Sequence, residues 1–229
     1  MKDDRKIQAV IFDMDGLLLD SEGLWIDCWT EVGSEAGLPV EDIRSAARAV
    51  IGMNAQATRE TFLRVLHAEM DYDYYKAKAS ERFAQAEKEG RLLLKEGAEE
   101  ILSQLHARGY RLALATSTEH RTAERQMRER GLWQYFHACA FGSEVAHSKP
   151  APDVFLLAAE RLGVAPEQSC VLEDSYNGVR AAHAAGMRCI MVPDLLPPDE
   201  EMRQLADSVV PDLEHALPEI LNMQTARVV

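Results

Sequence analysis

Two aspartates that follow a short apolar run are the residues of this chain best placed to do chemistry. Asp13 and Asp15 come directly after residues 7–12, whose apolar character is typical of a buried strand. Open α/β sheets bind their ligands at the carboxyl ends of such strands. Two carboxylates in one small volume repel each other, so the pair indicates a metal site, a shared proton, or a nucleophile with its acid/base partner. A solvated turn is the alternative, since Asp and Gly are ordinary turn residues.

Other chemically useful side chains also follow apolar runs. Glu173 and Asp174 form a second acidic pair, and two adjacent acids are more than the start of a turn requires. Thr116 and Ser117 offer hydroxyl groups and helix-start amides to an anion, with an ordinary helix cap as the simpler interpretation. Lys149 lies in a loop between Ser148 and Pro150, where a solvated lysine is the simpler interpretation. The elements that carry these residues decide whether they meet.

Short apolar runs alternate with helical patterns from residue 110 onward. The expected strands span 111–115, 138–141, 170–172 and 189–192, and the expected helices span 119–130, 152–162 and 177–185. Strands and helices in alternation predict a parallel sheet, in which all strands open on the same edge. The run at 7–12 belongs to this sheet by its character, and Val209 and Val210 could add an edge strand. The sequence therefore predicts that several strand ends bring the polar residues together.

The segment between the first strand and the rest of the sheet has helical character. Ser21 can cap a first helix, and residues 54–68 and 74–88 have amphipathic patterns. The tryptophans and tyrosines of this segment are most simply explained by helix packing. We therefore predict an α/β fold with an inserted all-helical cap domain. The predicted division is a core of residues 1–18 and 91–229 and a cap of residues 19–90.

Composition narrows the partners and the compartment. The 229 residues can bury a full core, and a formal charge of −13, from 25 basic and 38 acidic residues, argues against nucleic acid or an anionic membrane as a partner. No apolar run is long enough to span a bilayer. The cysteines have no Cys-x-x-Cys spacing and are interpreted as reduced core residues, namely Cys28, Cys139, Cys170 and Cys189. We expect a cytoplasmic protein that is a monomer or a weak oligomer.

The strand-end residues together have one coherent chemistry. Two acidic pairs without a histidine pair favour a hard cation with oxygen ligands, Mg²⁺ rather than zinc. The cation and the ammonium of Lys149 would offset repulsion between a phosphoryl group and the carboxylates. At ~4 Å and an effective dielectric constant of about 20, each unit pair is worth on the order of 4 kcal/mol before desolvation. One carboxylate could then attack phosphorus to form an acyl phosphate, while the other donates a proton to the leaving oxygen and later accepts one from water.

The motifs Asp13-Met14-Asp15-Gly16, Thr116, Lys149 and Glu173-Asp174, in this order, resemble the four motifs of the haloacid dehalogenase superfamily. The inserted helical segment is similar to the cap of the branch that holds β-phosphoglucomutases, sugar-phosphate phosphatases and pseudouridine-monophosphate phosphatases. The resemblance implies a Rossmann-like core, Mg²⁺ as the cofactor and a small phosphorylated substrate.

The resemblance also implies a role for each motif residue. Asp13 would be the nucleophile and Asp15 the general acid/base. Thr116, Ser117 and Lys149 would bind the phosphoryl group. The metal site would consist of Asp13, Asp15 through its backbone carbonyl, Asp174, and Glu173 beside it.

Single positions favour one reaction over its rivals. Asp15 argues against dehalogenation, because a leaving halide needs no proton. Trp25 and Ala55 stand where the phosphoglucomutases of this branch carry a histidine and an arginine, so hydrolysis is favoured and a phosphosugar mutase is the alternative. A phosphoacceptor signalling domain is a rival from another class, but such receivers carry the acidic pair and the phosphorylated aspartate on different strands and have no cap. We therefore predict a Mg²⁺-dependent phosphatase of a sugar phosphate or nucleoside monophosphate, working through an aspartyl phosphate.

Overall fold

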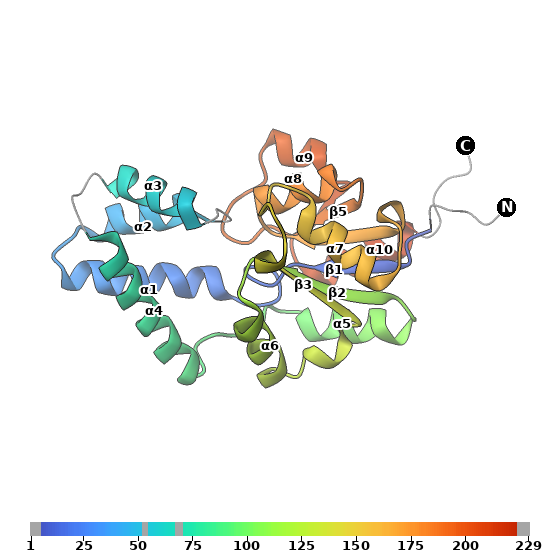
Figure 1. Cartoon of the computed structure of the whole chain (residues 1–229), viewed down its shortest axis with the longest axis horizontal. Coiled ribbons are helices and arrows are strands. Elements are labelled where there is room, and N and C mark those ends of the chain that lie inside the picture. The colour runs from blue at the N-terminus through green and yellow to red at the C-terminus, as the bar shows by residue number, and fades with distance from the viewer. Residues whose placement is uncertain (1–5, 52–54, 67–70, 224–229) are drawn as a thin grey trace. The chain divides into compact units, whose positions relative to one another are not determined.

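The structure is a computed structural model, and it describes residues 6–51, 55–66 and 71–223. The chain divides into two compact units (Figure 1). The core unit comprises residues 1–18 and 94–229, and the helical unit comprises residues 19–93. Each unit buries a hydrophobic cluster of its own.

A six-stranded parallel sheet lies at the centre of the core unit. Its strands, in spatial order, are β3 (Ala138–Phe141), β2 (Arg111–Thr116), β1 (Ala9–Phe12), β4 (Ser169–Glu173), β5 (Arg188–Met191) and β6 (Ser208–Val209). The predicted α/β fold with a Rossmann-like parallel sheet is confirmed, and β6 is the expected edge strand. All residues of β1 and β4 are buried, which explains why these strands are continuous apolar runs rather than alternating ones.

Helices connect the strands and cover the sheet (Figure 1). They are α5 (Ala98–Ala107), α6 (His120–Glu129), α7 (Asp153–Leu162), α8 (Tyr176–Ala184), α9 (Glu200–Leu205) and α10 (Leu213–Asn222). α7 packs against β1, β2 and β3, and α8 packs against β4 and β5. Ile11, Phe155 and Val171 lie in the buried cluster that these elements share. α5 packs against β2, and α10 packs against α5.

The pairing register determines which residues emerge at the carboxyl edge of the sheet. Phe12 in β1 lies opposite Leu114 in β2 and Leu172 in β4. Asp13 is the next residue, and its N–H donates to the carbonyl oxygen of Leu172 at 3.1 Å. Because the strands are parallel, the polar residues that follow β1, β2 and β4 emerge at one edge of the sheet.

The helical unit contains four helices in its described residues, α1 (Ser21–Glu35), α2 (Val40–Ala49), α3 (Ala55–Leu66) and α4 (Tyr72–Lys88). α1 packs against α2 and α4, and α2 packs against α3. The ring centroids of Trp29 and Phe62 lie 4.3 Å apart, and those of Trp25 and Phe83 also lie 4.3 Å apart. Packing between helices therefore accounts for both tryptophans, as expected.

Two details at helix starts differ from expectation. Asp20 precedes α1, and Ser21 is the buried first residue of the helix rather than its cap. Pro152 lies at the N-cap position of α7, so the helix begins at Asp153. The spacing of apolar residues locates a helix, whereas its first turn depends on local backbone geometry that the spacing does not encode.

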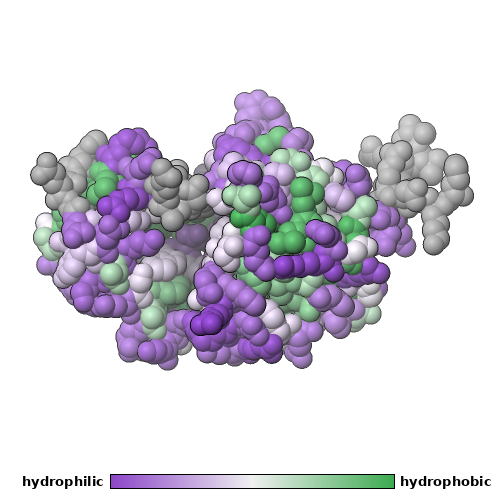
Figure 2. All heavy atoms as spheres, viewed as in Figure 1, coloured by the Kyte–Doolittle hydropathy of each residue, from purple (hydrophilic) through white to green (hydrophobic). Residues whose placement is uncertain are grey.

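Hydrophilic side chains predominate on the visible face of the helical unit in Figure 2. Within the described ranges, no helix is long and apolar enough to cross a membrane. The four cysteines are free. Cys28, Cys170 and Cys189 are buried, as expected of core residues, whereas Cys139 is only half-buried.

Candidate active site

Three carboxylate groups converge at the edge of the sheet where β1 and β4 end. Asp13, Glu173 and Asp174 each place a carboxylate oxygen within 4.8 Å of the others, and all three residues are buried. Their convergence follows from the sheet, because β1 and β4 are paired neighbours and the two acidic pairs lie at their ends. We call these three residues the carboxylate cluster.

Lys149 reaches into the carboxylate cluster from the segment that precedes α7. Its Nζ atom donates to Oδ1 of Asp13 at 2.5 Å, to Oε1 of Glu173 at 2.6 Å and to the carbonyl oxygen of Ala115 at 3.4 Å. The same atom lies 4.7 Å from the centroid of the Phe155 ring. The Lys149 side chain is only 8% exposed, so it is not the solvated loop lysine that is the simpler interpretation of its sequence position.

Glu173 is held on both of its carboxylate oxygens. Oε1 accepts from Lys149, and Oε2 accepts from the N–H and the hydroxyl of Ser175, each at 3.0 Å. Ser175 is also the N-cap of α8, where its hydroxyl oxygen accepts from the N–H of Gly178 at 3.1 Å. A Cβ at Gly178 would lie 1.8 Å from the Glu173 carboxyl carbon, so only glycine leaves room for this carboxylate. Sequence reasoning missed Ser175 and Gly178, whose only signal was a Ser cap followed by a glycine inside a helix.

Burial and Lys149 act in opposite directions on the pKa of Asp13. Burial raises the pKa of Asp13, Lys149 lowers it, and the charges of Glu173 and Asp15 raise it further, with a net rise to about 7. For Lys149, burial alone would lower the pKa, but the charges and hydrogen bonds of Asp13 and Glu173 outweigh burial and raise it. Lys149 is therefore cationic, whereas ionised Asp13 needs more positive charge than Lys149 supplies.

The donor set fits a hard divalent cation. Three carboxylates face one ammonium, and among the residues that the structure describes the cluster includes neither cysteine nor histidine. Oxygen ligands of this kind suit Mg²⁺. Gly16 lets the loop after β1 approach the cluster, because a Cβ there would lie 2.2 Å from Oδ2 of Asp174 and the φ of +76° favours glycine. Asp13, Asp174 and Glu173 are thus the side chains that could hold a cation.

Asp15 lies at the same edge, with its carboxylate directed to the residues that follow β2. The Thr118 hydroxyl donates to Oδ2 of Asp15 at 2.6 Å, and Oγ1 of Thr116 lies 3.5 Å from the same oxygen. Thr116 is buried, whereas Ser117 is exposed. The Asp15 carboxylate is not part of the carboxylate cluster. Thr118 was not singled out from the sequence, because a threonine ahead of a helix is normally explained as a cap.

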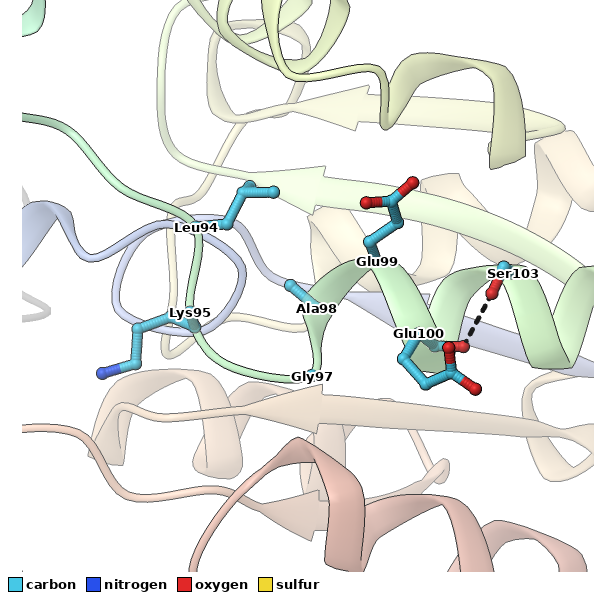
Figure 3. A pocket seen from close by; sticks show the side chains of 7 residues that line it. All are labelled: Leu94, Lys95, Gly97, Ala98, Glu99, Glu100 and Ser103. Carbon is cyan, nitrogen blue, oxygen red and sulfur yellow. Dashed lines mark hydrogen bonds between the residues drawn. The ribbon is translucent and has the colours of Figure 1, made fainter. Parts of the chain in front are cut away.

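A separate pocket lies where the chain enters α5 (Figure 3). Its lining residues are Leu94, Lys95, Gly97, Ala98, Glu99, Glu100 and Ser103. The hydroxyl of Ser103 donates to the backbone carbonyl of Glu100 at 3.0 Å, which is an ordinary contact within a helix. None of the predicted site residues lines this pocket.

Comparisons with known proteins agree with this geometry. The family described as haloacid dehalogenase-like hydrolase matches residues 10–192. A phosphorylated carbohydrates phosphatase of Thermotoga maritima is 36% identical over 187 residues, which cover 80% of this chain and 84% of the relative. A protein of Drosophila melanogaster, provisionally named a pseudouridine-5′-phosphatase, is 35% identical over 198 residues and 83% of each chain. A crystal structure from Thermotoga maritima, provisionally described as a β-phosphoglucomutase, has a TM-score of 0.77 and 32% identity, covering 94% of this chain and 99% of that one.

Proposed function

The chain belongs to the haloacid dehalogenase-like hydrolases, and we propose that it is a Mg²⁺-dependent phosphatase that acts through an aspartyl phosphate on Asp13. One observation carries the proposal. Asp13 ends the central strand in a buried position, 2.5 Å from Nζ of Lys149 and within 4.8 Å of the Glu173 and Asp174 carboxylates. A nucleophile, a phosphoryl counter-charge and oxygen ligands for a cation therefore meet in one small volume.

Each site residue has a role in this proposal, and Asp13 and Asp15 have two roles each. Asp13 and Asp174 would hold the cation, with Glu173 beside them, and we propose the Asp15 backbone carbonyl as a further ligand. A bound Mg²⁺ would supply the positive charge that lets an anionic ester approach three carboxylates. Lys149 and the hydroxyl end of β2, with Thr116 and Ser117, bind the phosphoryl oxygens. Glu173, fixed by Ser175, keeps the Lys149 ammonium in place.

The reaction takes place in two displacements. An Asp13 carboxylate oxygen attacks phosphorus as the ester P–O bond breaks, and Asp15 gives a proton to the leaving alcohol oxygen. Water then attacks the phosphorus of the aspartyl phosphate, passes a proton to Asp15, and releases Asp13 with inorganic phosphate. Both aspartates return to their starting states, so the cycle balances.

We infer that the substrate is a small phosphorylated metabolite, a sugar phosphate or a nucleoside monophosphate. The names of the two relatives above support this class, since one acts on phosphorylated carbohydrates and the other is named for a nucleoside monophosphate. The charge of −13 supports a diffusible partner rather than nucleic acid or an anionic membrane. We further propose a cytoplasmic monomer or weak oligomer, which gel filtration and fractionation would test.

A β-phosphoglucomutase-type mutase is the second candidate, because the crystal structure described above matches nearly the whole chain. Mutase and phosphatase share the aspartyl phosphate and differ in whether a sugar hydroxyl or water attacks it. Trp25 replaces the histidine expected in the mutases, and its ring stacks on Phe83 inside the helical unit. The other sequence argument concerns the loop near Gly52 and the side chain of Ala55, which lie outside the described residues.

A paired assay tests the proposal. A panel of phosphorylated metabolites is incubated with the protein and Mg²⁺, and phosphate release is measured beside conversion of glucose 1-phosphate to glucose 6-phosphate with added bisphosphate. We expect phosphate release that EDTA abolishes and that Asp13→Asn lacks while keeping its circular dichroism spectrum. Hydroxylamine should trap the aspartyl phosphate of the wild type as a hydroxamate. Isomerisation without phosphate release would favour the mutase, and near-normal turnover by Asp13→Asn would remove Asp13 as the nucleophile.

A further inference from the structure

Thr118 makes a short side-chain hydrogen bond to the Asp15 carboxylate. Its hydroxyl donates to Oδ2 of Asp15 at 2.6 Å, within the usual range for a hydrogen bond between two oxygen atoms. Thr116 lies 3.5 Å from the same oxygen, at the limit of a hydrogen bond. Of these two threonines, Thr118 makes the closer contact with the Asp15 carboxylate.

The ordinary explanation of Thr118 as a helix cap does not apply. The N-cap of α6 is Glu119, whose side chain accepts from the N–H of Thr122 at 3.2 Å. The N–H of Thr118 instead donates to Oγ1 of Thr116 at 3.0 Å. This bond ties the backbone of Thr118 to the end of β2, so that its hydroxyl is presented to Asp15 from a fixed position.

We propose that Thr118 is a positioning residue that aims the Asp15 carboxylate at the leaving oxygen of the substrate. The inference rests on the proposed phosphatase function. It assigns to Thr118 the orientation of the carboxyl group with which Asp15 transfers the proton. A carboxylate on a single rotatable stem can turn away from its target, and proton transfer requires hydrogen-bond reach in the reacting geometry. An anchor on Oδ2 holds the plane of the carboxyl group without touching the reacting atoms.

The contact can also persist through the cycle. A hydroxyl is a donor, and both an ionised and a protonated carboxyl group offer it an acceptor oxygen. Thr118 can therefore hold Asp15 before and after it gives its proton to the leaving group. A lysine or arginine in the same place would hold only the ionised form well.

The dependence of kcat/KM on the leaving group of the ester measures this role of Thr118. We compare wild type, Thr118→Val and Thr118→Ser, with Mg²⁺ present, on 4-nitrophenyl phosphate, phenyl phosphate and fructose 1-phosphate, whose leaving groups need a proton to an increasing extent. Valine keeps the branched shape and removes the hydroxyl, and serine restores the hydroxyl. Thr122→Val makes the same change within the first turn of α6 and serves as the matched control.

We expect Thr118→Val to lower kcat/KM for fructose 1-phosphate by about 10- to 100-fold, with a small loss on 4-nitrophenyl phosphate. Thr118→Ser should recover most of the activity, and Thr122→Val should resemble wild type on all three esters. Because Thr118 acts through Asp15, the double variant Asp15→Asn/Thr118→Val should be no slower than Asp15→Asn alone.

Three results would overturn the inference while leaving the proposed function standing, provided that wild type releases phosphate and Asp13→Asn does not. They are equal losses on all three esters, an effect confined to KM, and losses that multiply in the double variant. Equal losses would indicate general distortion of the site, and a pure KM effect would indicate direct substrate binding. A wild type without phosphatase activity would instead refute the function itself.

Discussion

Lys149 and Asp13 form a buried ion pair between the loop ahead of α7 and the end of the central strand, with Nζ 2.5 Å from Oδ1 and both side chains at most 10% exposed. Glu173 shares the same ammonium at 2.6 Å. One cation thus serves two carboxylates in a place with little water, where breaking a pair leaves an uncompensated charge. The stability of this edge of the sheet and its chemistry consequently depend on the same atoms.

Replacing Lys149 should therefore damage both properties. We expect Lys149→Met to lower kcat with Mg²⁺ by about 100-fold or more, because a phosphoryl counter-charge is lost. We also expect it to lower the free energy of unfolding in EDTA by roughly 3–5 kcal/mol at neutral pH, because two buried carboxylates lose their partner. Lys95→Met is the matched control, since Lys95 pairs with Asp194 at 2.6 Å elsewhere in the core unit. Similar losses of turnover in the two variants would contradict a special role for Lys149.

The raised pKa of Asp13 predicts how the metal-free protein responds to pH. Burial is the main cause of the rise from 3.8 to about 7, and the opposing effect of Lys149 does not cancel it. The folded protein thus binds this proton more tightly than the unfolded chain does. The stabilisation is complete below pH 3.8 and is lost as the pH rises through about 7.

We therefore expect wild type in EDTA to lose stability relative to Asp13→Asn between about pH 5 and about pH 8, since asparagine does not titrate. Urea unfolding of both proteins at the two pH values measures the difference. Mg²⁺ should reduce this difference in stability, because the cation offsets the charge of the ionised Asp13 carboxylate. If wild type gained stability over Asp13→Asn as the pH rose, the sign of the Asp13 shift would be wrong.

Gly178 should tolerate no side chain. Alanine at this position would place its Cβ 1.8 Å from the Glu173 carboxyl carbon, so α8 or the carboxylate must move. We expect Gly178→Ala to lower the free energy of unfolding by about 1–3 kcal/mol and to reduce turnover through displacement of Glu173 and Lys149.

Gly23 provides the control for this substitution. It also lies inside a helix, but its nearest neighbour would be Oδ1 of Asp20 at 3.6 Å, an ordinary contact. Gly23→Ala should stabilise the protein by about 0.5–1 kcal/mol, because glycine is a poor helix former. If Gly178→Ala behaved like Gly23→Ala in thermal unfolding and in turnover, the Glu173 carboxylate would accommodate the added Cβ without loss of stability or activity.

Gly16 should matter for the cation rather than only for the backbone. Gly16→Ala combines a φ of +76° with a Cβ that would lie 2.2 Å from Oδ2 of Asp174. We expect the concentration of Mg²⁺ needed for half-maximal activity to rise about tenfold or more, because this ligand must move. Gly37→Ala carries a similar φ of +80° with no neighbour within 4 Å, so it should cost about 1–2 kcal/mol of stability and leave the Mg²⁺ requirement unchanged. An unchanged requirement in Gly16→Ala would remove Asp174 from the cation site.

The sequence alone determined the sheet and the list of residues at its edge. Continuous apolar runs such as 7–12 and 170–172 are typical of strands buried on both faces, and their alternation with helices predicts a parallel order. Asp13, Thr116 and Glu173 could therefore be placed at strand ends before any coordinates were known. Helix starts were less certain, as Ser21 shows, because they depend on single local contacts.

Only the tertiary structure decided which atoms of that edge meet. Lys149 is an ambiguous loop residue in the sequence, and it becomes a buried partner of Asp13 because the loop ahead of α7 brings its ammonium to the residue that follows β1. Gly178 and Thr118 gain their importance from contacts with Glu173 and Asp15, which lie on other strands or at their ends. Periodicity and motif spacing record which face or end a residue occupies, whereas the distance between two side chains is set by the packing of segments far apart in the chain.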